Sequence, residues 1–270
     1  MVGDFERRKS QPEREELVTD PDEIARVEAE NGLRQTKFIE DTIEQNLQAA
    51  TTFSLRPSLI SSLNRLAIQG LSELPGIYRP GGTRITNSNH IPPIPEDVPR
   101  LMEEMCDYVN DHWHRDAWHL ASYLMWRLNW IHPFEDGNGR TSRAISYIVL
   151  CLKLGQRLPG SKTIPEVISE KKRPYYDAID KADAAAKQGK IDVTAMETVL
   201  KNALAAQLAD FADTVTGGHL TGNARPGGNE GRQQRPRWTA RLHEHYNNHP
   251  FWYWFAPAIL AVVGVLISVV

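Results

Sequence analysis

The chain has 270 residues, of which 41% are hydrophobic and 24% are charged, and its formal net charge is −3. This composition is that of a globular protein with one core or two small domains, and it excludes a chain that is mostly disordered. The small negative charge gives no overall field that would attract nucleic acid, so we expect no nucleic-acid partner. The cysteines, Cys106 and Cys151, are far apart in apolar stretches, which predicts buried and reduced thiols.

The first part of the chain, residues 1–19, is polar and rich in charge. It has no apolar stretch, which predicts a disordered N-terminus without a secretory signal. Residues 20–47 then have helical spacing behind an acidic start at Asp20. After Pro57, apolar residues recur every three or four positions to about residue 70. We therefore expect two helices at the beginning of a folded domain that covers residues 20–213.

Residues 76–95 have a different composition, in which Gly-Gly, Asn-Ser-Asn and Pro-Pro turns separate short β-type stretches. This pattern predicts a β-hairpin or an extended flap. Helical spacing returns over residues 98–108 and 117–128, and again in a helix that ends near Gly155. The last two predicted helices cover residues 164–186 and 191–213. The domain is therefore predicted to be all-α apart from one small hairpin.

The C-terminal part changes character twice. Residues 214–250 are rich in Gly, Pro, Asn and Gln, which is typical of a flexible linker. Residues 251–270 contain no charge, and as a helix they would span ~30 Å, the thickness of the hydrocarbon core of a bilayer. Aromatic residues begin this segment and arginines precede it, so we expect a transmembrane tail anchor that leaves the folded domain in the cytoplasm. The alternative is a C-terminal helix buried in the core.

The most informative stretch is 131–143, with the sequence IHPFEDGNGRTSR. The Gly-Asn-Gly run at 137–139 precedes a helix and allows positive φ angles, so several N–H groups can point at one anion, as in phosphate sites. Arg140 and Arg143 are three residues apart and project on nearly the same side of that helix. Positive charge near a helix N-terminus is unfavourable unless a polyanion binds there. The stretch therefore predicts a phosphate-binding loop.

Two further residues of this loop predict chemistry. Asp136 would hold a Mg²⁺ ion, which prefers one or two carboxylates together with phosphate oxygens and water. His132 has the side chain best suited to accept a proton near neutral pH. A base, a metal ligand and a phosphate-binding loop within one short stretch predict transfer of a phosphate-containing group.

The same stretch resembles the motif HxFx(D/E)GNGRxxR of the Fic (filamentation induced by cAMP) family. The matching residues are His132, Phe134, Asp136, Gly137, Asn138, Gly139, Arg140 and Arg143. The flap and residues 164–183 are also similar to the family, so the resemblance covers about residues 20–213. It implies a Fic-type helical bundle with a β-hairpin flap.

The resemblance also implies an activity. The protein would be a protein adenylyltransferase, or AMPylator, that transfers AMP from ATP to a hydroxyl side chain of a target protein with the help of Mg²⁺. His132 would deprotonate the hydroxyl, Phe134 would anchor the loop, and Asp136 would coordinate Mg²⁺. The flap, residues 76–90, would bind the target's backbone as an added strand. The alternative for the flap is a plain surface hairpin.

The resemblance assigns the remaining motif residues to the nucleotide. Asn138 and the N–H groups of Gly137 and Gly139 would hold the phosphates. Arg140 would contact the β-phosphate and Arg143 the γ-phosphate. These assignments place ATP, as co-substrate, at the start of the helix that follows the loop.

Many Fic proteins inhibit themselves through a helix with the pattern (S/T)xxxE(G/N), whose glutamate pairs with the second arginine of the motif. Glu30 and Asn31 fit the end of this pattern, but Arg26 stands where Ser or Thr is expected. The resemblance therefore implies that Glu30 is inhibitory through Arg143. Glu28 is a possible substitute, and the alternative is an ordinary solvated glutamate.

Three functions are compatible with the sequence. The first is a membrane-tethered adenylyltransferase that inhibits itself. The second is an enzyme of the same fold that uses another nucleotide or phospho-donor, or that removes AMP from a modified protein. The third is a non-enzymatic, membrane-tethered binding module, against which the intact motif argues. The sequence identifies neither the target protein nor the oligomeric state.

Overall fold

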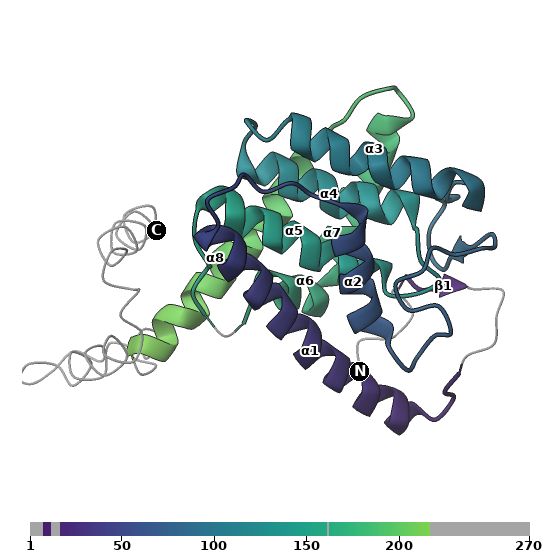
Figure 1. The fold of residues 1–270 in the computed structure, drawn as a ribbon, viewed down its shortest axis with the longest axis horizontal. Helices are drawn as coiled ribbons and strands as arrows, with labels where there is room; N and C mark the ends of the chain where they lie inside the picture. Colours follow the sequence, from purple (N-terminus) through teal and green to yellow (C-terminus); the bar gives the residue numbers. More distant parts are fainter. Residues whose placement is uncertain (1–7, 12–16, 161, 217–270) are drawn as a thin grey trace, which may run out of the picture. The chain divides into compact units, whose positions relative to one another are not determined.

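The computed structural model of the chain describes residues 8–11, 17–160 and 162–216 (Figure 1). It contains two compact units, Met1–Gln207 and Leu208–Val270, and of the second unit it describes only the end of the last helix. The elements are β1 (Ser10–Gln11), α1 (Pro21–Gln48), α2 (Pro57–Ile68), β2 (Arg84–Ile85), a 3-10 helix η2 (Pro95–Asp97), α3 (Val98–Asp111), α4 (Ala117–Ile131), α5 (Asn138–Leu154), α6 (Ile164–Glu170), α7 (Lys172–Ala186) and α8 (Thr194–Thr216).

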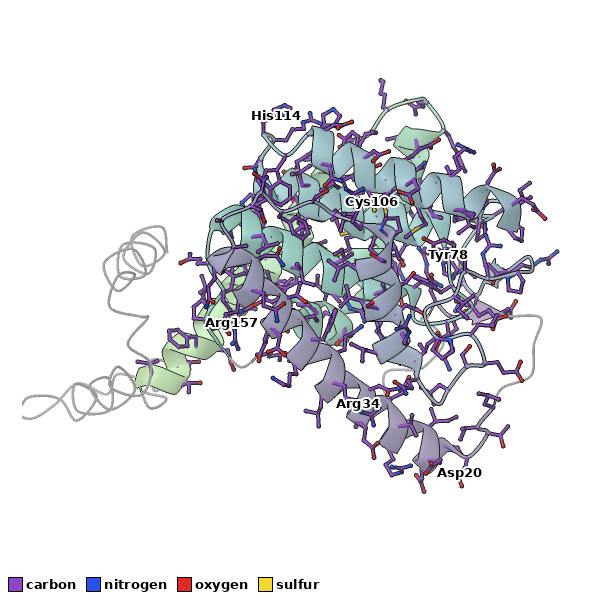
Figure 2. All side chains as sticks on the ribbon, in the orientation of Figure 1. Asp20, Arg34, Tyr78, Cys106, His114 and Arg157 are labelled. Atoms are coloured by element: carbon purple, nitrogen blue, oxygen red, sulfur yellow. The ribbon has the colours of Figure 1, made fainter. Side chains whose placement is uncertain are left out.

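The predicted helices begin and end where local signals place them. The Asp20 side chain caps α1 by accepting hydrogen bonds from the N–H groups of Asp22 and Glu23, at 2.8 and 3.1 Å, and Pro21 occupies the first turn. Helix α5 ends at Gly155, whose φ of +70° is the left-handed conformation common at helix C-termini. In Figure 2, Asp20 marks the start of α1 and Arg34 lies on its exposed side.

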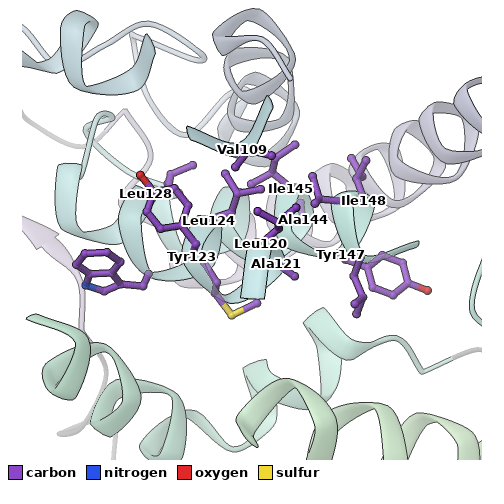
Figure 3. Close-up of a cluster of buried hydrophobic side chains, with 14 of the residues drawn as sticks. Val109, Leu120, Ala121, Tyr123, Leu124, Leu128, Ala144, Ile145, Tyr147 and Ile148 are labelled. Atoms are coloured by element: carbon purple, nitrogen blue, oxygen red, sulfur yellow. The ribbon is translucent and has the colours of Figure 1, made fainter. Parts of the chain in front are cut away.

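Helix α5 occupies the centre of the core. It packs against α4 and also contacts α1, α2 and α6, and Figure 3 shows the apolar side chains of α3, α4 and α5 meeting. The predicted apolar faces of these helices are buried at Val98, Leu101, Met102, Met105, Leu120, Ala121, Leu124, Met125, Leu128, Ala144, Ile145, Ile148 and Val149. The amino end of α5 is therefore fixed by the packing of the whole helix.

The two cysteines are buried, as predicted. Burial raises the pKa of the Cys106 thiol to about 12 and that of Cys151 to about 11. Both side chains therefore remain neutral thiols near neutral pH and act as small apolar core residues.

The segment 164–186 forms two helices, where the sequence spacing had predicted one. The break falls at Lys171, which has φ −121° and ψ 74°. Pro174 explains the break, because proline has no N–H to donate to the carbonyl of Glu170 and its ring would clash with that carbonyl in a continuous helix. The turn between α6 and α7 lets α7 contact α4.

The predicted flap hairpin is wrong in its strand pairing. Strand β2 lies in the flap, but its partner in the two-stranded antiparallel sheet is β1, with Ser10 opposite Ile85. The flap contains several proline and glycine residues, which do not support a second ladder strand. Part of segment 1–19, which the sequence predicts to be disordered, thus has a defined place on the flap.

The predicted transmembrane helix, and the membrane location that depended on it, are corrected. Among the described residues, no helix combines the length and the apolar composition that crossing a membrane requires. Helices α1 and α8 have 28 and 23 residues, but charged side chains recur along both. The segment 251–270, on which the anchor and the cytoplasmic placement of the domain rested, lies outside the described residues, as does most of the predicted linker.

Candidate active site

His132 lies at the C-terminal end of α4 and is almost fully buried, with 5% of its surface exposed. Its backbone is left-handed, with φ 51° and ψ 57°, which turns the chain out of the helix and toward the loop. The ring nitrogen Nδ1 lies 3.3 Å from the carbonyl oxygen of Asn129, and Nε2 lies 2.8 Å from Oγ of Ser10. A neutral imidazole with its proton on Nδ1 satisfies both contacts, donating to Asn129 and accepting from Ser10.

The surroundings of His132 favour this neutral form. The pKa of His132 is lowered to about 4, mainly because the ring is buried and in smaller part because Arg79 and His90 lie nearby, while the hydrogen bond to Asn129 and the charge of Asp136 oppose this shift. The Nε2 atom therefore remains unprotonated across the physiological pH range and keeps a lone pair that can accept a proton. A buried neutral histidine beside a hydroxyl is the arrangement that general-base catalysis requires.

The loop after His132 is closed by its own side chains. The Phe134 N–H donates to Oδ1 of Asn138 at 3.0 Å, and Nδ2 of Asn138 donates to the Phe134 carbonyl at 2.8 Å. The Phe134 ring is fully buried, 5.7 Å from the ring of Tyr78. Phe134 thus anchors the loop, and the amide of Asn138 holds the loop's shape, whereas the resemblance implied that this side chain holds phosphate.

Gly137 is fixed by close packing. It has a φ of +76°, and a Cβ atom there would lie 2.6 Å from Cγ2 of Ile68 and 2.9 Å from Nδ2 of Asn64. Only glycine fits this backbone at this distance from α2. The consequence is that the first N–H groups of α5, which have no partner within the helix, are held toward the cavity described below.

Asn64 is a buried brace that the sequence analysis missed. Its Nδ2 donates to the Asp136 carbonyl at 2.8 Å and lies 3.3 Å from Oγ1 of Thr141, while its Oδ1 accepts from the Gly76 N–H at 3.0 Å. It therefore joins α2, the loop, α5 and the start of the flap. A polar residue inside the apolar stripe of α2 was the signal that could have identified it.

Asp136 and Arg140 form an ion pair in the loop. One Nη of Arg140 donates to Oδ2 of Asp136 at 2.6 Å, and the other donates to Oε1 of Glu28, on α1, at 3.0 Å. Half of the Asp136 side chain is exposed, so its carboxylate can reach a ligand in the cavity. Arg140, which the resemblance assigned to the β-phosphate, is held here between two carboxylates.

Glu30 lies on another face of α1 from Glu28. Its carboxylate accepts from Arg26 and from Arg34, the latter at 3.0 Å, rather than from Arg143 as the resemblance implied. The inward face of α1 instead includes Asn31, whose amide donates to the carbonyl of Gln69 just after α2, and Gln35, whose amide donates to the carbonyl of Leu63 in α2. Glu28 shares that face because it precedes Asn31 by three residues.

Arg143 lies one turn after Arg140, half-buried, with an Nη atom close to Gly139. Burial lowers its pKa, and the neighbouring Tyr175 opposes this effect. Tyr175 is itself buried and its hydroxyl accepts from Nδ2 of Asn129 at 2.7 Å. Arg143 therefore projects between the loop and α7.

Arg79 connects the flap to the loop that begins at His132, and the sequence analysis did not identify it. Its Nε donates to the carbonyl of His132 at 2.8 Å, and its own N–H donates to the carbonyl of Pro133 at 2.9 Å. The guanidinium also donates to carbonyls of the flap at Gly81 and Pro93. The position of the flap relative to the base is thus fixed by a buried side chain.

One cavity lies between His132, the start of α5 and α7. It is lined by His132, by residues 136–140, by Arg143, by Tyr175 and Tyr176 of α7, and by Arg8 and Lys9 of the N-terminal segment. The predicted motif residues are therefore brought together, whereas Glu30 does not line the cavity. Arg143 contributes a positive charge to its wall, and Arg140 would contribute a second one if a polyphosphate took the place of its carboxylate partners.

The chemistry of Asp136 suits Mg²⁺ only in part. Within the described residues there is no cluster of three or more His, Cys, Asp or Glu side chains that could hold a metal. Mg²⁺ commonly binds to one or two carboxylates and takes its other ligands from phosphate oxygens and water. The half-exposed carboxylate of Asp136 fits that mode of binding.

Comparisons with known proteins agree with this site. Residues 54–150 match the Fic/DOC family model. The chain is 31% identical over 112 residues to the protein adenylyltransferase Fic of Nematostella vectensis, covering 40% of this chain and 24% of that protein. It is 41% identical over 64 residues to the Drosophila persimilis protein of the same name, covering 23% and 12%. The chain therefore spans a quarter or less of the length of these curated relatives.

Solved structures show the same fold. A Fic family protein from Desulfovibrio desulfuricans G20 has a TM-score of 0.53 at 23% identity, covering 73% of this chain and 55% of that one. Fic-1 from C. elegans also has a TM-score of 0.53, at 19% identity, covering 70% and 52%. The family model thus matches the loop and the helices that position it, and the curated relatives that the chain resembles are named protein adenylyltransferases.

Proposed function

We propose that the protein is a protein adenylyltransferase that transfers AMP from ATP to a hydroxyl side chain of a protein. One observation supports this most directly: Nε2 of the neutral His132 lies 2.8 Å from a hydroxyl oxygen, in the same cavity as the amino end of α5. A base in contact with an alcohol beside an anion-binding helix end is suited to attack by that alcohol on a phosphate group.

In this mechanism His132 accepts the hydroxyl proton as the oxygen attacks the α-phosphorus of ATP. The N–H groups at the start of α5 orient the phosphates, and Arg140 and Arg143 neutralise the pyrophosphate that leaves. Asp136 would hold Mg²⁺, which supplies further positive charge to the leaving pyrophosphate. Because burial lowers its pKa, His132 is unprotonated near neutral pH and able to accept the hydroxyl proton.

Glu28 competes with ATP for Arg140 in this proposal. Its carboxylate and that of Asp136 both bind Arg140, so phosphates must compete with two carboxylates for one guanidinium. We infer that Glu28 lowers the affinity for ATP in the resting protein. The inhibitory role that the resemblance implies for Glu30 remains a separate prediction, and both are tested below.

The proposed partner is a protein segment in extended conformation. Ile85 of strand β2 and His132 line the same cavity, and β2 pairs with β1. A target segment would take the place of β1, since added strands bind sheet edges through their backbone hydrogen bonds. A target hydroxyl on such a strand would reach the imidazole.

A transfer assay with two labels tests the proposal. The chain is incubated with the proteins of a cell extract and with ATP labelled on either the α- or the γ-phosphorus. We expect acid-stable incorporation from α-labelled ATP that is lost in His132→Ala, and incorporation from γ-labelled ATP, by the kinases of the extract, that does not differ between the two chains. The matched control is His114→Ala, since His114 is an exposed histidine outside the cavity.

The assay separates the proposal from its alternatives. Incorporation from the γ-phosphorus that depends on His132 would identify a phosphotransferase and overturn the proposal. Undiminished incorporation in His132→Ala would remove His132 as the base. A GTP, CTP or UTP donor that is used in preference to ATP would keep the transferase and change its nucleotide.

A further inference from the structure

The N-terminal segment lies on the flap as a bound peptide would. Strand β1 is antiparallel to β2, with Ser10 opposite Ile85. The backbone pairing continues at Lys9, whose carbonyl accepts from the Thr86 N–H at 2.9 Å and whose N–H donates to Oγ1 of Thr86 at 2.8 Å. These hydrogen bonds set the register of the segment without reading its sequence.

Arg8 anchors the segment from the opposite side of the cavity. Its guanidinium donates to both carboxylate oxygens of Asp180 on α7, at 2.8 and 2.6 Å, and to the Asn87 carbonyl at 3.2 Å. It also lies over the Tyr176 ring, 4.8 Å from the ring centre. Only 14% of the Arg8 side chain is exposed. A bidentate contact of this kind is specific in geometry, so it fixes the segment along its length.

Register and anchor together place one side chain on the base. Side chains alternate along a strand, so Arg8 and Ser10 share one face, on which they contact Asp180 and His132, while Lys9 and Gln11 are exposed. Oγ of Ser10 lies 2.8 Å from Nε2 of His132, which is the distance for proton transfer to a general base. The hydroxyl in contact with the base therefore comes from the chain itself.

We infer that Ser10 is an acceptor of the nucleotidyl group, modified by its own chain. This inference rests on the proposed function. The Ser10 oxygen forms a bond to the α-phosphorus of ATP, and the bond from that phosphorus to the oxygen bridging the β-phosphate breaks. Pyrophosphate leaves with the bonding electrons, and the Ser10 proton passes to His132 and then to water. The product is a phosphodiester of AMP on Ser10.

The test uses the purified full chain, α-labelled ATP and Mg²⁺, with no other protein present. Peptide mass spectrometry should locate AMP on Ser10. Ser10→Ala should lose this label and Ser10→Thr, which keeps a hydroxyl, should retain it. The first-order rate constant should not change over a hundredfold range of chain concentration, because the acceptor and the base are on one molecule. In a mixture of His132→Ala and Ser10→Ala chains, Ser10 should remain unlabelled.

Two acidic residues of α7 provide a matched pair of variants. Asp180→Asn removes the charge that binds Arg8 and should slow labelling of Ser10 by roughly two- to fivefold, since the pair is partly exposed. Asp177→Asn removes a carboxylate one turn earlier that contacts Arg173 and should leave the rate unchanged.

The outcomes distinguish this inference from the proposed function. If extract proteins are labelled in a His132-dependent manner but Ser10 is not, the function stands and the inference is overturned. Labelling of Ser10 in the mixed-variant experiment would overturn modification by its own chain. If no His132-dependent label appears on any protein, both fail together.

Discussion

The two sides of the cavity are built in different ways. The nucleotide side, residues 132–143, is held by contacts between residues close in sequence and by buried packing, such as the two hydrogen bonds between Phe134 and Asn138. The acceptor side, β1 on β2, is held by backbone pairing and by a partly exposed ion pair between residues more than 70 positions apart. In such a site the loop of residues 132–143 keeps its geometry, while another strand can replace β1 on β2.

The largest effect is expected from a substitution in the loop of residues 132–143. Gly137→Ala combines a left-handed backbone, which costs about 1–2 kcal/mol for a residue with a Cβ, with contacts at 2.6 and 2.9 Å to Ile68 and Asn64 that add about 1–3 kcal/mol. We expect the free energy of unfolding to fall by the sum of the backbone and the packing contributions, and we expect ATP binding to be lost. Chemical denaturation and calorimetry measure both.

The control for this variant is Gly155→Ala at the other end of α5. Its φ is +70°, but a Cβ there would have no neighbour within 4 Å. It should lose only the backbone contribution, about 1–2 kcal/mol, and keep ATP binding. Equal destabilisation by the two variants would show that packing against α2 does not hold the loop.

A second test concerns the protonation of the base. The pKa of His132 is lowered from 6.5 to about 4 by burial, so between these values the unfolded chain binds more protons than the folded one. The free energy of unfolding should therefore have its full His132 contribution above pH 6.5 and lose it as the pH falls toward 4. Ring ¹⁵N shifts should report a neutral His132 at pH 5.5 in the protein without nucleotide.

The comparison variant for this test is His132→Asn, which does not titrate. Its stability should lack the part of the pH dependence that falls between pH 6.5 and 4. Identical pH profiles for the two proteins would contradict a neutral, buried imidazole.

The smallest effect is expected at the edge of the cavity, where Glu28 binds Arg140. The Glu28 side chain is 36% exposed, so Glu28→Gln should raise the affinity for ATP only by roughly two- to fivefold. Glu30→Gln should leave it unchanged if the resting contacts of Glu30 with Arg26 and Arg34 are its only role. Isothermal titration with a non-hydrolysable ATP analogue measures both variants, and a larger effect of Glu30→Gln would restore Glu30 as the inhibitory residue.

The sequence predicts the features that depend on nearby residues. The cap at Asp20, the end of α5 at Gly155 and the buried faces of α3 to α5 are all local patterns, and the structure confirms them. The motif residues could be assigned to one loop for the same reason. Pro174 could also have predicted the break between α6 and α7, because a proline in a helix interior removes a backbone hydrogen bond.

The remaining features depend on the tertiary arrangement. The motif pattern points to Glu30, but the docking of Asn31 onto α2 sets the rotation of α1, and that rotation turns Glu28 inward. The pairing of Ser10 with Ile85 and the contact of Arg79 with the His132 carbonyl join distant segments. No local sequence pattern predicts either contact.

The alternation of side chains on β1 limits what the flap can recognise. Lys9 and Gln11 are exposed, so the site can select only every second residue of any strand that pairs with β2. For the chain's own segment the minimal recognised sequence is Arg-x-Ser, in which the arginine binds Asp180 and the serine meets His132. A one-residue slip would turn both side chains to solvent. Selectivity among acceptors is thus decided by register and by one charge two residues before the hydroxyl.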